Sequence, residues 1–142
     1  MGKVLAVCVS EIRGIQKKDI SKVELIENYG LKNDAHAGTW HRQVSLLAIE
    51  KIEEFEKRGI ELEHGAFGEN FVVSGIDLVK LPIGTRLKIG EAEIEVTQIG
   101  KRCHSRCHIY DTVGDCIMPR EGIFAKVIKG GMVKVDDEVE VI

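Results

Sequence analysis

The chain has 142 residues, a formal net charge of −3 at pH 7 and a hydrophobic fraction of 44%. This length fits a single domain over residues 1–142 that can bury a core without staples. The negative charge argues against a general nucleic-acid binder, and no apolar run approaches the roughly 18 residues of a membrane span. Four cysteines without an export signal indicate a reducing compartment. We therefore expect a cytoplasmic protein with no nucleic-acid or membrane partner.

The first part of the chain is predicted to contain two strands separated by a loop. Residues 3–9 (KVLAVCV) form a valine-rich apolar run that predicts a buried strand, with Cys8 as a small hydrophobic residue. Residues 10–20 show no periodicity and are predicted to form a loop. Residues 22–28 (KVELIEN) alternate well enough for a second strand.

A polar loop follows at residues 30–38 (GLKNDAHAG). Glycine, asparagine and aspartate tolerate positive φ and hydrogen-bond their own backbone, so we expect this loop to have a defined shape. Asp34 and His36 could be ligands or a proton-transfer pair. The alternative is that Asp34 stabilises a turn while His36 caps a neighbouring carbonyl.

The clearest helix of the chain follows directly after a strand. Residues 43–47 (QVSLL) predict the strand, and residues 48–58 place apolar side chains on one face and charged ones on the other. Gly59 supplies the stop. We interpret the charged face as solvated.

Residues 64–73 (HGAFGENFVV) place two glycines immediately before a predicted strand. Such a pattern predicts a tight turn at a close approach of two backbone segments. Glu69 and Asn70 lie where this turn meets the strand. Residues 74–83 are predicted to form a loop.

The second half of the chain is predicted to be mostly extended. Residues 87–89 and 92–96 alternate as a hairpin whose second arm ends at Gly100, and residues 122–129 are either helical or extended. Residues 132–135 and 139–142 are predicted to close the domain as a hairpin. Seven to nine short strands with one clear helix predict a mainly β fold with few helices, as a β-barrel or strongly curved sheet.

The densest chemistry lies in residues 101–108 (KRCHSRCH), which begin where a predicted strand stops. Nearby cations favour the thiolate form of Cys103 and Cys107, and thiolate is both the nucleophile and the metal ligand. Guanidinium groups can hold a phosphate bidentately. A soft thiolate beside an anion clamp suits a metal cofactor that carries a phosphate.

Three other interpretations stay open for this stretch. Cys103, Cys107 and Cys116 could bind zinc together with a histidine, although C-x3-C is looser than the usual C-x2-C spacing. Two of the cysteines could form a redox pair, although the thioredoxin-like spacing is lacking. The histidines and arginines could also be ordinary polar residues of a loop.

Three segments together resemble the MOSC domain, the C-terminal module of eukaryotic molybdenum cofactor sulfurases that also occurs as small free-standing bacterial proteins. They are residues 30–36 (GLKNDAH), 42–47 (RQVSLL) and 65–71 (GAFGENF), supported by residues 84–90 (GTRLKIG) and the late-chain cysteine. The G-x-F-G-E-N segment is the most specific of them. The chain thus looks like a free-standing bacterial-type member.

The resemblance implies a β-barrel-like fold and a role in molybdenum chemistry. Related domains bind the pyranopterin molybdenum cofactor (molybdopterin), with a cysteine sulfur at the metal or carrying sulfur as a persulfide, and some reduce N-hydroxylated compounds. The Ser105-Arg106-Cys107 tripeptide is similar to the cysteine motif of the amidoxime-reducing members. Cys107 is therefore our first choice as catalytic thiolate and metal ligand, and Cys103 is the second.

The resemblance also suggests which residues hold or brace the cofactor and which partners are needed. Many members have a glycine where this chain has Asn33, but asparagine tolerates the same left-handed turn. The chain has no room for a pyridoxal phosphate domain, so that cofactor is not expected. A molybdenum-dependent or sulfur-transfer activity would need a partner, such as an electron donor, a molybdoenzyme or a protein of molybdenum cofactor biosynthesis.

The alternative function is a structural zinc-binding or accessory docking module without catalysis. The residues expected to bind or brace the cofactor are Lys101, Arg102, Arg106, Asp34, His36, Glu69 and Asn70.

Overall fold

The structure is a computed structural model, and within the part of the chain that it describes no helix is long and apolar enough to cross a bilayer. The described residues are 2–12, 17–57, 59, 64–65, 67–100 and 122–142.

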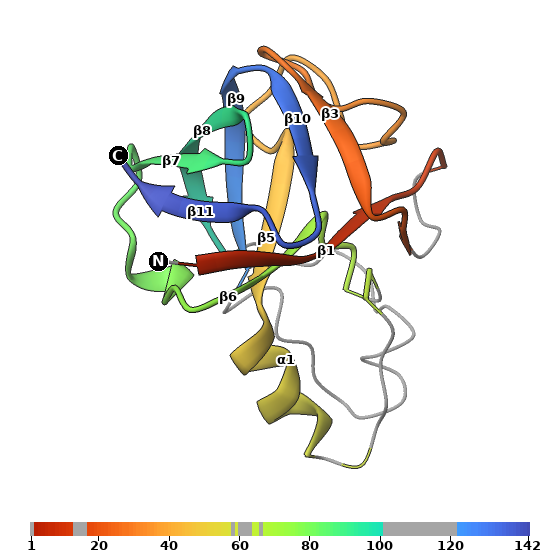
Figure 1. Ribbon diagram of the computed structural model, residues 1–142, viewed down its shortest axis with the longest axis vertical. Coiled ribbons are helices and arrows are strands. Elements are labelled where there is room, and N and C mark those ends of the chain that lie inside the picture. The colour runs from red at the N-terminus through yellow and green to blue at the C-terminus, as the bar shows by residue number, and fades with distance from the viewer. Residues whose placement is uncertain (1, 13–16, 58, 60–63, 66, 101–121) are drawn as a thin grey trace.

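Seven strands among these residues close into a β-barrel (Figure 1). They run in the order β1-β11-β7-β8-β9-β5-β6, and β6 pairs with β1 to complete the circle. Neighbours pair antiparallel except β5 and β6, which are parallel. The barrel strands are β1 (Gly2–Val9), β5 (Val44–Ala48), β6 (Phe71–Ser74), β7 (Arg86–Ile89), β8 (Ala92–Ile99), β9 (Ile123–Lys129) and β11 (Glu138–Val141).

Smaller elements flank the barrel. A second sheet joins β10 (Gly131–Lys134), β3 (Lys22–Ile26) and β4 (Gly30–Leu31) in that order, and the short β2 (Lys18–Asp19) pairs with β1. The helix α1 (Ile49–Glu56) follows β5 without a break, and the 3-10 helix η1 (Leu78–Lys80) follows β6. The expected mainly β, barrel-like fold with few helices is confirmed.

Two apolar layers explain why the strands β1, β5 and β6 are apolar on both faces. Leu46 faces the barrel interior, whereas Leu47 belongs to a second cluster that includes Ile52 and Phe55 of α1. Phe55 meets Phe67 edge to face, with ring centroids 5.4 Å apart. Alternate residues of these strands therefore serve different cores, which produces continuous apolar runs instead of an alternating pattern. Figure 1 shows α1 projecting from the end of the barrel that β5 leaves.

Three predicted elements need correction or completion. The predicted hairpin between residues 132–135 and 139–142 is wrong. Instead, β10 pairs with β3, while β11 pairs with β7 and β1 and thereby closes the barrel. Between the two strands Asp136 adopts φ +77°, so the chain turns from one sheet into the other. The loop predicted for residues 10–20 contains β2, and of the two alternatives for residues 122–129 the extended one is correct.

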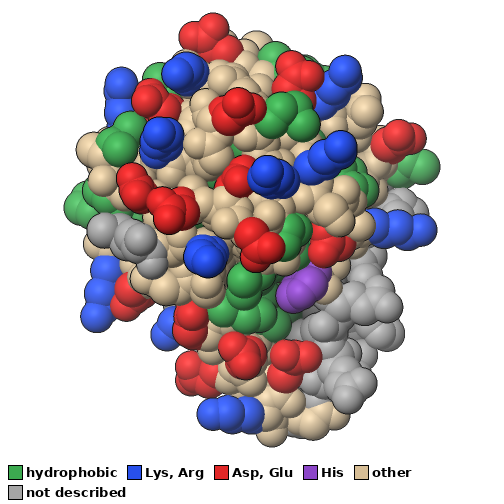
Figure 2. All heavy atoms as spheres, viewed as in Figure 1, with side chains coloured by type: hydrophobic (Ala, Val, Ile, Leu, Met, Phe, Trp, Pro, Cys, Tyr) green, Lys and Arg blue, Asp and Glu red, His purple; other side chains and the backbone are tan. Residues whose placement is uncertain are grey.

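The surface of the barrel seen in Figure 2 carries basic and acidic side chains intermixed. Among the described side chains on this face, neither sign of charge forms a continuous field. A surface of this kind exerts little long-range attraction on a charged partner.

Candidate functional site

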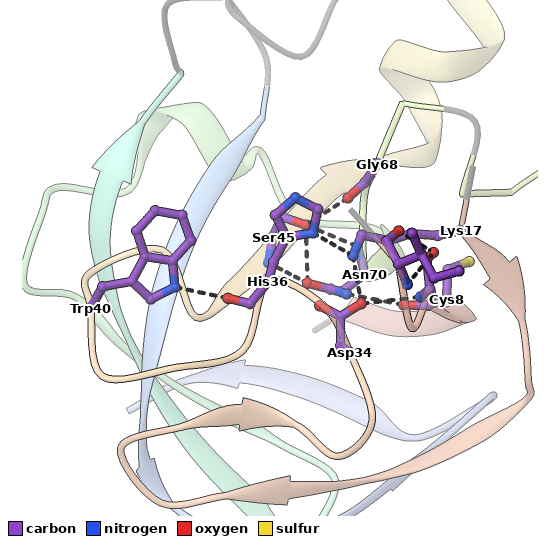
Figure 3. A network of polar contacts seen from close by, with 10 residues as sticks. Cys8, Lys17, Asp34, His36, Trp40, Ser45, Gly68 and Asn70 are labelled. Atoms are coloured by element: carbon purple, nitrogen blue, oxygen red, sulfur yellow. Dashed lines mark hydrogen bonds and ion pairs between the residues drawn. The ribbon is translucent and has the colours of Figure 1, made fainter. Parts of the chain in front are cut away.

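A polar cluster lies beside the barrel, formed by the buried Lys17 and Asp34 and the half-buried His36, and is called the Lys17 cluster below (Figure 3). The Lys17 Nζ atom lies 2.5 Å from Asp34 Oδ1 and 2.9 Å from His36 Nδ1. The side chain of Lys17 is 1% exposed and that of Asp34 is 0% exposed. The backbone N–H of Ser10 donates to the same Oδ1 at 3.1 Å, and Asp34 Oδ2 has no hydrogen-bond partner among the described residues. A cation and an anion are thus desolvated together and paired directly.

The loop that carries Asp34 and His36 has a defined shape, as predicted. Two successive turns are closed by hydrogen bonds from the Asp34 N–H to the Leu31 carbonyl and from the Ala37 N–H to the Asp34 carbonyl, each 3.1 Å long. Asn33 adopts φ +68°, in the left-handed region that asparagine tolerates. The short polar residues of this segment therefore fix the directions of Asp34 and His36.

The turn before β6 packs directly on the backbone of Lys17. Gly65 adopts φ +91°, and a Cβ atom at this position would lie 2.2 Å from the Lys17 carbonyl oxygen. The carboxylate of Glu69 holds the turn, because its two oxygens accept from the N–H groups of Gly65 and Phe67 at 3.0 Å each. The predicted tight turn at a close approach is confirmed, and its neighbour is the Lys17 backbone.

Burial shifts the proton affinities of this region in opposite directions for acid and base. Desolvation lowers the pKa of the Lys17 ammonium, while the hydrogen bond and the charge of Asp34 oppose that shift. Desolvation raises the pKa of the Glu69 carboxyl, against the stabilising backbone N–H donors. Burial disfavours the charged form of each group, and the specific partners of each group oppose that effect.

Asn70, directly before β6, links β5 to β1 through both polar atoms of its side chain. Its Oδ1 accepts from the Ser45 N–H at 2.9 Å, and its Nδ2 donates to the Cys8 carbonyl oxygen at 3.0 Å. The thiol of Cys8 itself is buried, and burial raises its pKa well above the ordinary value, with the charge of Glu69 acting in the same direction. Cys8 therefore remains a neutral core thiol, as predicted from its place in an apolar strand.

The segment from Trp40 to Arg42 connects the Lys17 cluster to β8. The indole N–H of Trp40 donates to the His36 carbonyl oxygen at 2.8 Å, and His41 Nε2 lies 2.8 Å from Gln98 Oε1. The Arg42 guanidinium lies 4.6 Å from the Trp40 ring centroid and 5.7 Å from that of Phe124. Its Nε is buried and has no hydrogen-bond partner within the described part of the chain. A cation held between two aromatic rings with an unused donor is suited to an anionic group.

The same end of β8 precedes residues 101–121, which lie outside the described residues. The Gln98 Nε2 group donates to the Gly100 carbonyl oxygen at 2.7 Å, and the Gly100 N–H donates to the Gly122 carbonyl oxygen at 2.6 Å. This bond holds the two ends of the segment together, and Phe124 beside Arg42 comes two residues after Gly122. The prediction that the cysteine stretch starts at a strand end is confirmed at Gly100.

Most of the predicted site falls outside the described residues, namely Lys101, Arg102, Cys103, Arg106, Cys107 and Cys116. Of the remaining predicted residues, Asp34 and His36 meet in the Lys17 cluster. Glu69 and Asn70 are buried next to it and hydrogen-bond to backbone. Within the described ranges no group of three or more metal-ligating side chains is present.

Two residues of this region were missed from the sequence. Lys17 stands in an aperiodic stretch where nothing distinguishes it from its exposed neighbour Lys18. Arg42 was noted only as part of a family-like segment, although its position beside Trp40 and directly before a buried strand was a usable signal.

The closed barrel, the flanking three-stranded sheet and the buried Lys17–Asp34 ion pair beside them define a small β-barrel domain. The family model of the MOSC domain matches residues 33–140. The chain belongs to the MOSC domain family, which is associated with molybdenum cofactor binding.

Solved structures share the fold. The chain is similar to the YuaD protein from Bacillus subtilis, with a TM-score of 0.82 and 22% identity over 99% of this chain and 96% of that one. It is also similar to YiiM from Geobacillus stearothermophilus, with a TM-score of 0.76 and 20% identity over 100% of this chain and 75% of that one. YiiM from Escherichia coli gives a TM-score of 0.66 and 20% identity over 99% and 69%. No curated protein sequence matches the chain significantly.

Proposed function

We propose that this protein binds the molybdenum cofactor through a cysteine thiolate of residues 101–116, with Cys107 as the first ligand and Cys103 as the alternative. The observation that carries the proposal is the family match over residues 33–140, which spans the predicted residues Asp34, His36, Glu69 and Asn70 and the cysteine stretch. When bound, the cofactor would supply a redox-active metal with a soft preference for sulfur ligands.

The chemistry of the described donors fits an anionic group of this kind. Arg42 presents a guanidinium fixed between Trp40 and Phe124, with a buried Nε that has no acceptor. It lies close to the point where Gly100 and Gly122 hold the ends of the cysteine stretch together. In our proposal Arg42 joins Lys101, Arg102 and Arg106 in holding the phosphate of the cofactor.

The remaining predicted residues divide into two roles in this proposal. Asp34 and His36 belong to the polar cluster that faces the cofactor, while Glu69 and Asn70 brace the backbone behind it. This division rests on their hydrogen bonds, because both oxygens of Glu69 and both ends of Asn70 are already engaged.

Two forms of activity are compatible with cofactor binding. In the first, Cys107 stays at the metal and the chain reduces an N-hydroxylated compound with electrons from a partner protein. In the second, Cys107 carries sulfur as a persulfide to the cofactor or to a molybdoenzyme. The two forms differ in a mass measurement, because only the second adds one sulfur atom to Cys107 in a thiol-reversible manner.

The test is elemental analysis of protein purified from cells with an active molybdenum pathway. Wild type is expected to retain molybdenum, and Cys107→Ser is expected to lose most of it. Cys8→Ala serves as the matched control, because it also removes one cysteine but from a buried core position. Absence of molybdenum from wild type, or stoichiometric zinc in its place, contradicts the proposal. Equal molybdenum in wild type and Cys107→Ser excludes Cys107 as the ligand.

A further inference from the structure

In the Lys17 cluster, the Lys17 side-chain nitrogen lies against one ring nitrogen of His36. Lys17 Nζ lies 2.9 Å from His36 Nδ1 and 2.5 Å from Asp34 Oδ1, and its side chain is 1% exposed. A buried ammonium loses most of its hydration, so it is stable here only if each direction it faces offers an acceptor.

The charge state of Lys17 follows from its neighbour. A neutral amine at this position would leave the Asp34 carboxylate buried without a cation, at 0% exposure of its side chain. An uncompensated buried carboxylate is strongly destabilising. The ion pair therefore keeps Lys17 as an ammonium, which has three N–H donors and no lone pair.

This charge state dictates where His36 carries its proton. An ammonium can only donate, so Nδ1 of His36 must be the acceptor and is unprotonated. A doubly protonated ring would turn its Nδ1–H against the ammonium. The single ring proton then lies on Nε2.

The geometry points to Lys17 as a positioning residue that holds His36 in the Nε2–H form, so that His36 offers a hydrogen-bond donor to an anionic oxygen of a ligand. The ligand class is an oxyanion or a terminal oxo group, and this part rests on the proposed function. The tautomer itself is a property of the protein alone. In metal sites, the hydrogen-bond partner of one ring nitrogen of a histidine determines whether the other nitrogen is protonated.

The surroundings hold this arrangement from three sides. The Ser10 N–H donates to Asp34 Oδ1 at 3.1 Å, and the indole of Trp40 donates to the His36 carbonyl oxygen at 2.8 Å. Gly65 packs so tightly on the Lys17 carbonyl that a Cβ atom would overlap it. Figure 3 shows Lys17 meeting Asp34 and His36, two residues of one loop that lies 17 or more residues further along the chain. Their mutual geometry is therefore set by the fold and not by the three side chains alone.

The test is a long-range proton–nitrogen correlation spectrum of the histidine side chains, recorded on 15N-labelled protein free of cofactor at neutral pH. The signals of His36 are assigned by their loss in His36→Gln. Wild type is expected to show an unprotonated Nδ1 and a protonated Nε2 for this residue. A protonated Nδ1 in wild type overturns the inference, and this result does not depend on Lys17→Met folding.

Lys17→Met then tests the cause. Removing the donor is expected to give a mixture of tautomers, whereas Lys18→Met, at the exposed neighbouring position, is expected to leave the His36 signals unchanged. An unchanged Nε2–H form in folded Lys17→Met shows that Lys17 does not hold the ring and overturns the inference.

Molybdenum content separates this inference from the proposed function. Lys17→Met is expected to weaken cofactor binding about tenfold, as is typical when the partner behind a histidine is removed. Undiminished binding in Lys17→Met contradicts the ligand part of the inference. If wild type shows the Nε2–H form but binds no cofactor, the proposed function fails and the positioning role stands. If wild type binds cofactor with Nδ1 protonated, the proposed function stands and the positioning role of Lys17 fails.

Discussion

Two pairs of polar residues in this protein differ in how completely their buried side-chain atoms are hydrogen-bonded. Glu69 and Asn70 direct every side-chain oxygen and nitrogen to a backbone partner. Asp34 and Arg42 each keep one buried atom without a partner, Oδ2 and Nε respectively. Fully bonded buried groups act as scaffold, whereas we propose that the incompletely bonded ones lie on the side where a ligand binds.

We expect the largest effect on the free energy of unfolding at Asn70. Asn70→Asp replaces the Nδ2 donor 3.0 Å from the Cys8 carbonyl oxygen with a carboxylate oxygen and buries a charge that has no cation. We expect a loss of about 3–5 kcal/mol in the free energy of unfolding, measured by urea denaturation. The loss should shrink at low pH, because a protonated carboxyl can donate to that carbonyl.

Asn33→Asp is the matched control for this change. Asn33 is exposed and has φ +68°, which aspartate also tolerates, so little change is expected. Equal losses at both positions would contradict a scaffold role for Asn70.

The next effect is expected at Gly65. Gly65→Ala places a Cβ atom against the Lys17 carbonyl oxygen at 2.2 Å, whereas Gly84 has a similar φ of +95° and nothing within 4 Å of the added atom. Gly65→Ala should therefore cost about 1–3 kcal/mol more than Gly84→Ala in denaturant unfolding. If the two substitutions cost the same, only backbone strain matters and the close approach to Lys17 does not.

Such positions show what the sequence could and could not predict. The valine-rich run of β1, the strand-to-helix passage of β5 and α1 and the turn at Gly65 carry local signals of pattern and backbone freedom, and all three were predicted. The pairing of β10 with β3 carries no such signal, because alternation specifies which face is buried but not which strand lies alongside. Lys17 was missed for the same reason: its burial comes from Gly65 and Asp34, which lie far away in the chain.

The pH dependence of stability should reveal the buried ammonium. Burial lowers the pKa of Lys17 in the folded state below the ordinary value of 10.5, so the unfolded state binds more protons between those two values. Stability then rises with pH in that interval. The advantage of wild type over Lys17→Met in unfolding free energy should grow as pH 10.5 is approached, measured by urea unfolding at a series of pH values. A decreasing advantage would mean that the folded protein favours the protonated form more than the unfolded chain does.

The smallest effect on stability is expected at Arg42. The side chain keeps a buried Nε unbonded and gains mainly from its two aromatic neighbours, so Arg42→Met should cost about 1 kcal/mol or less. The same variant should lose molybdenum, because the proposed anion clamp loses its charge. Arg86→Met, at an exposed ion pair with Glu95, should leave molybdenum content unchanged. A large loss of stability with normal molybdenum content would assign Arg42 to the scaffold.

The central claim is that this MOSC domain holds the molybdenum cofactor through a cysteine that follows Gly100. The most direct measurement is the molybdenum content per chain of wild type, Cys107→Ser and Cys8→Ala, each purified from cells that make the cofactor. The account predicts bound molybdenum in wild type and Cys8→Ala and a marked loss in Cys107→Ser. Wild type without molybdenum, or Cys107→Ser with as much as wild type, would contradict it.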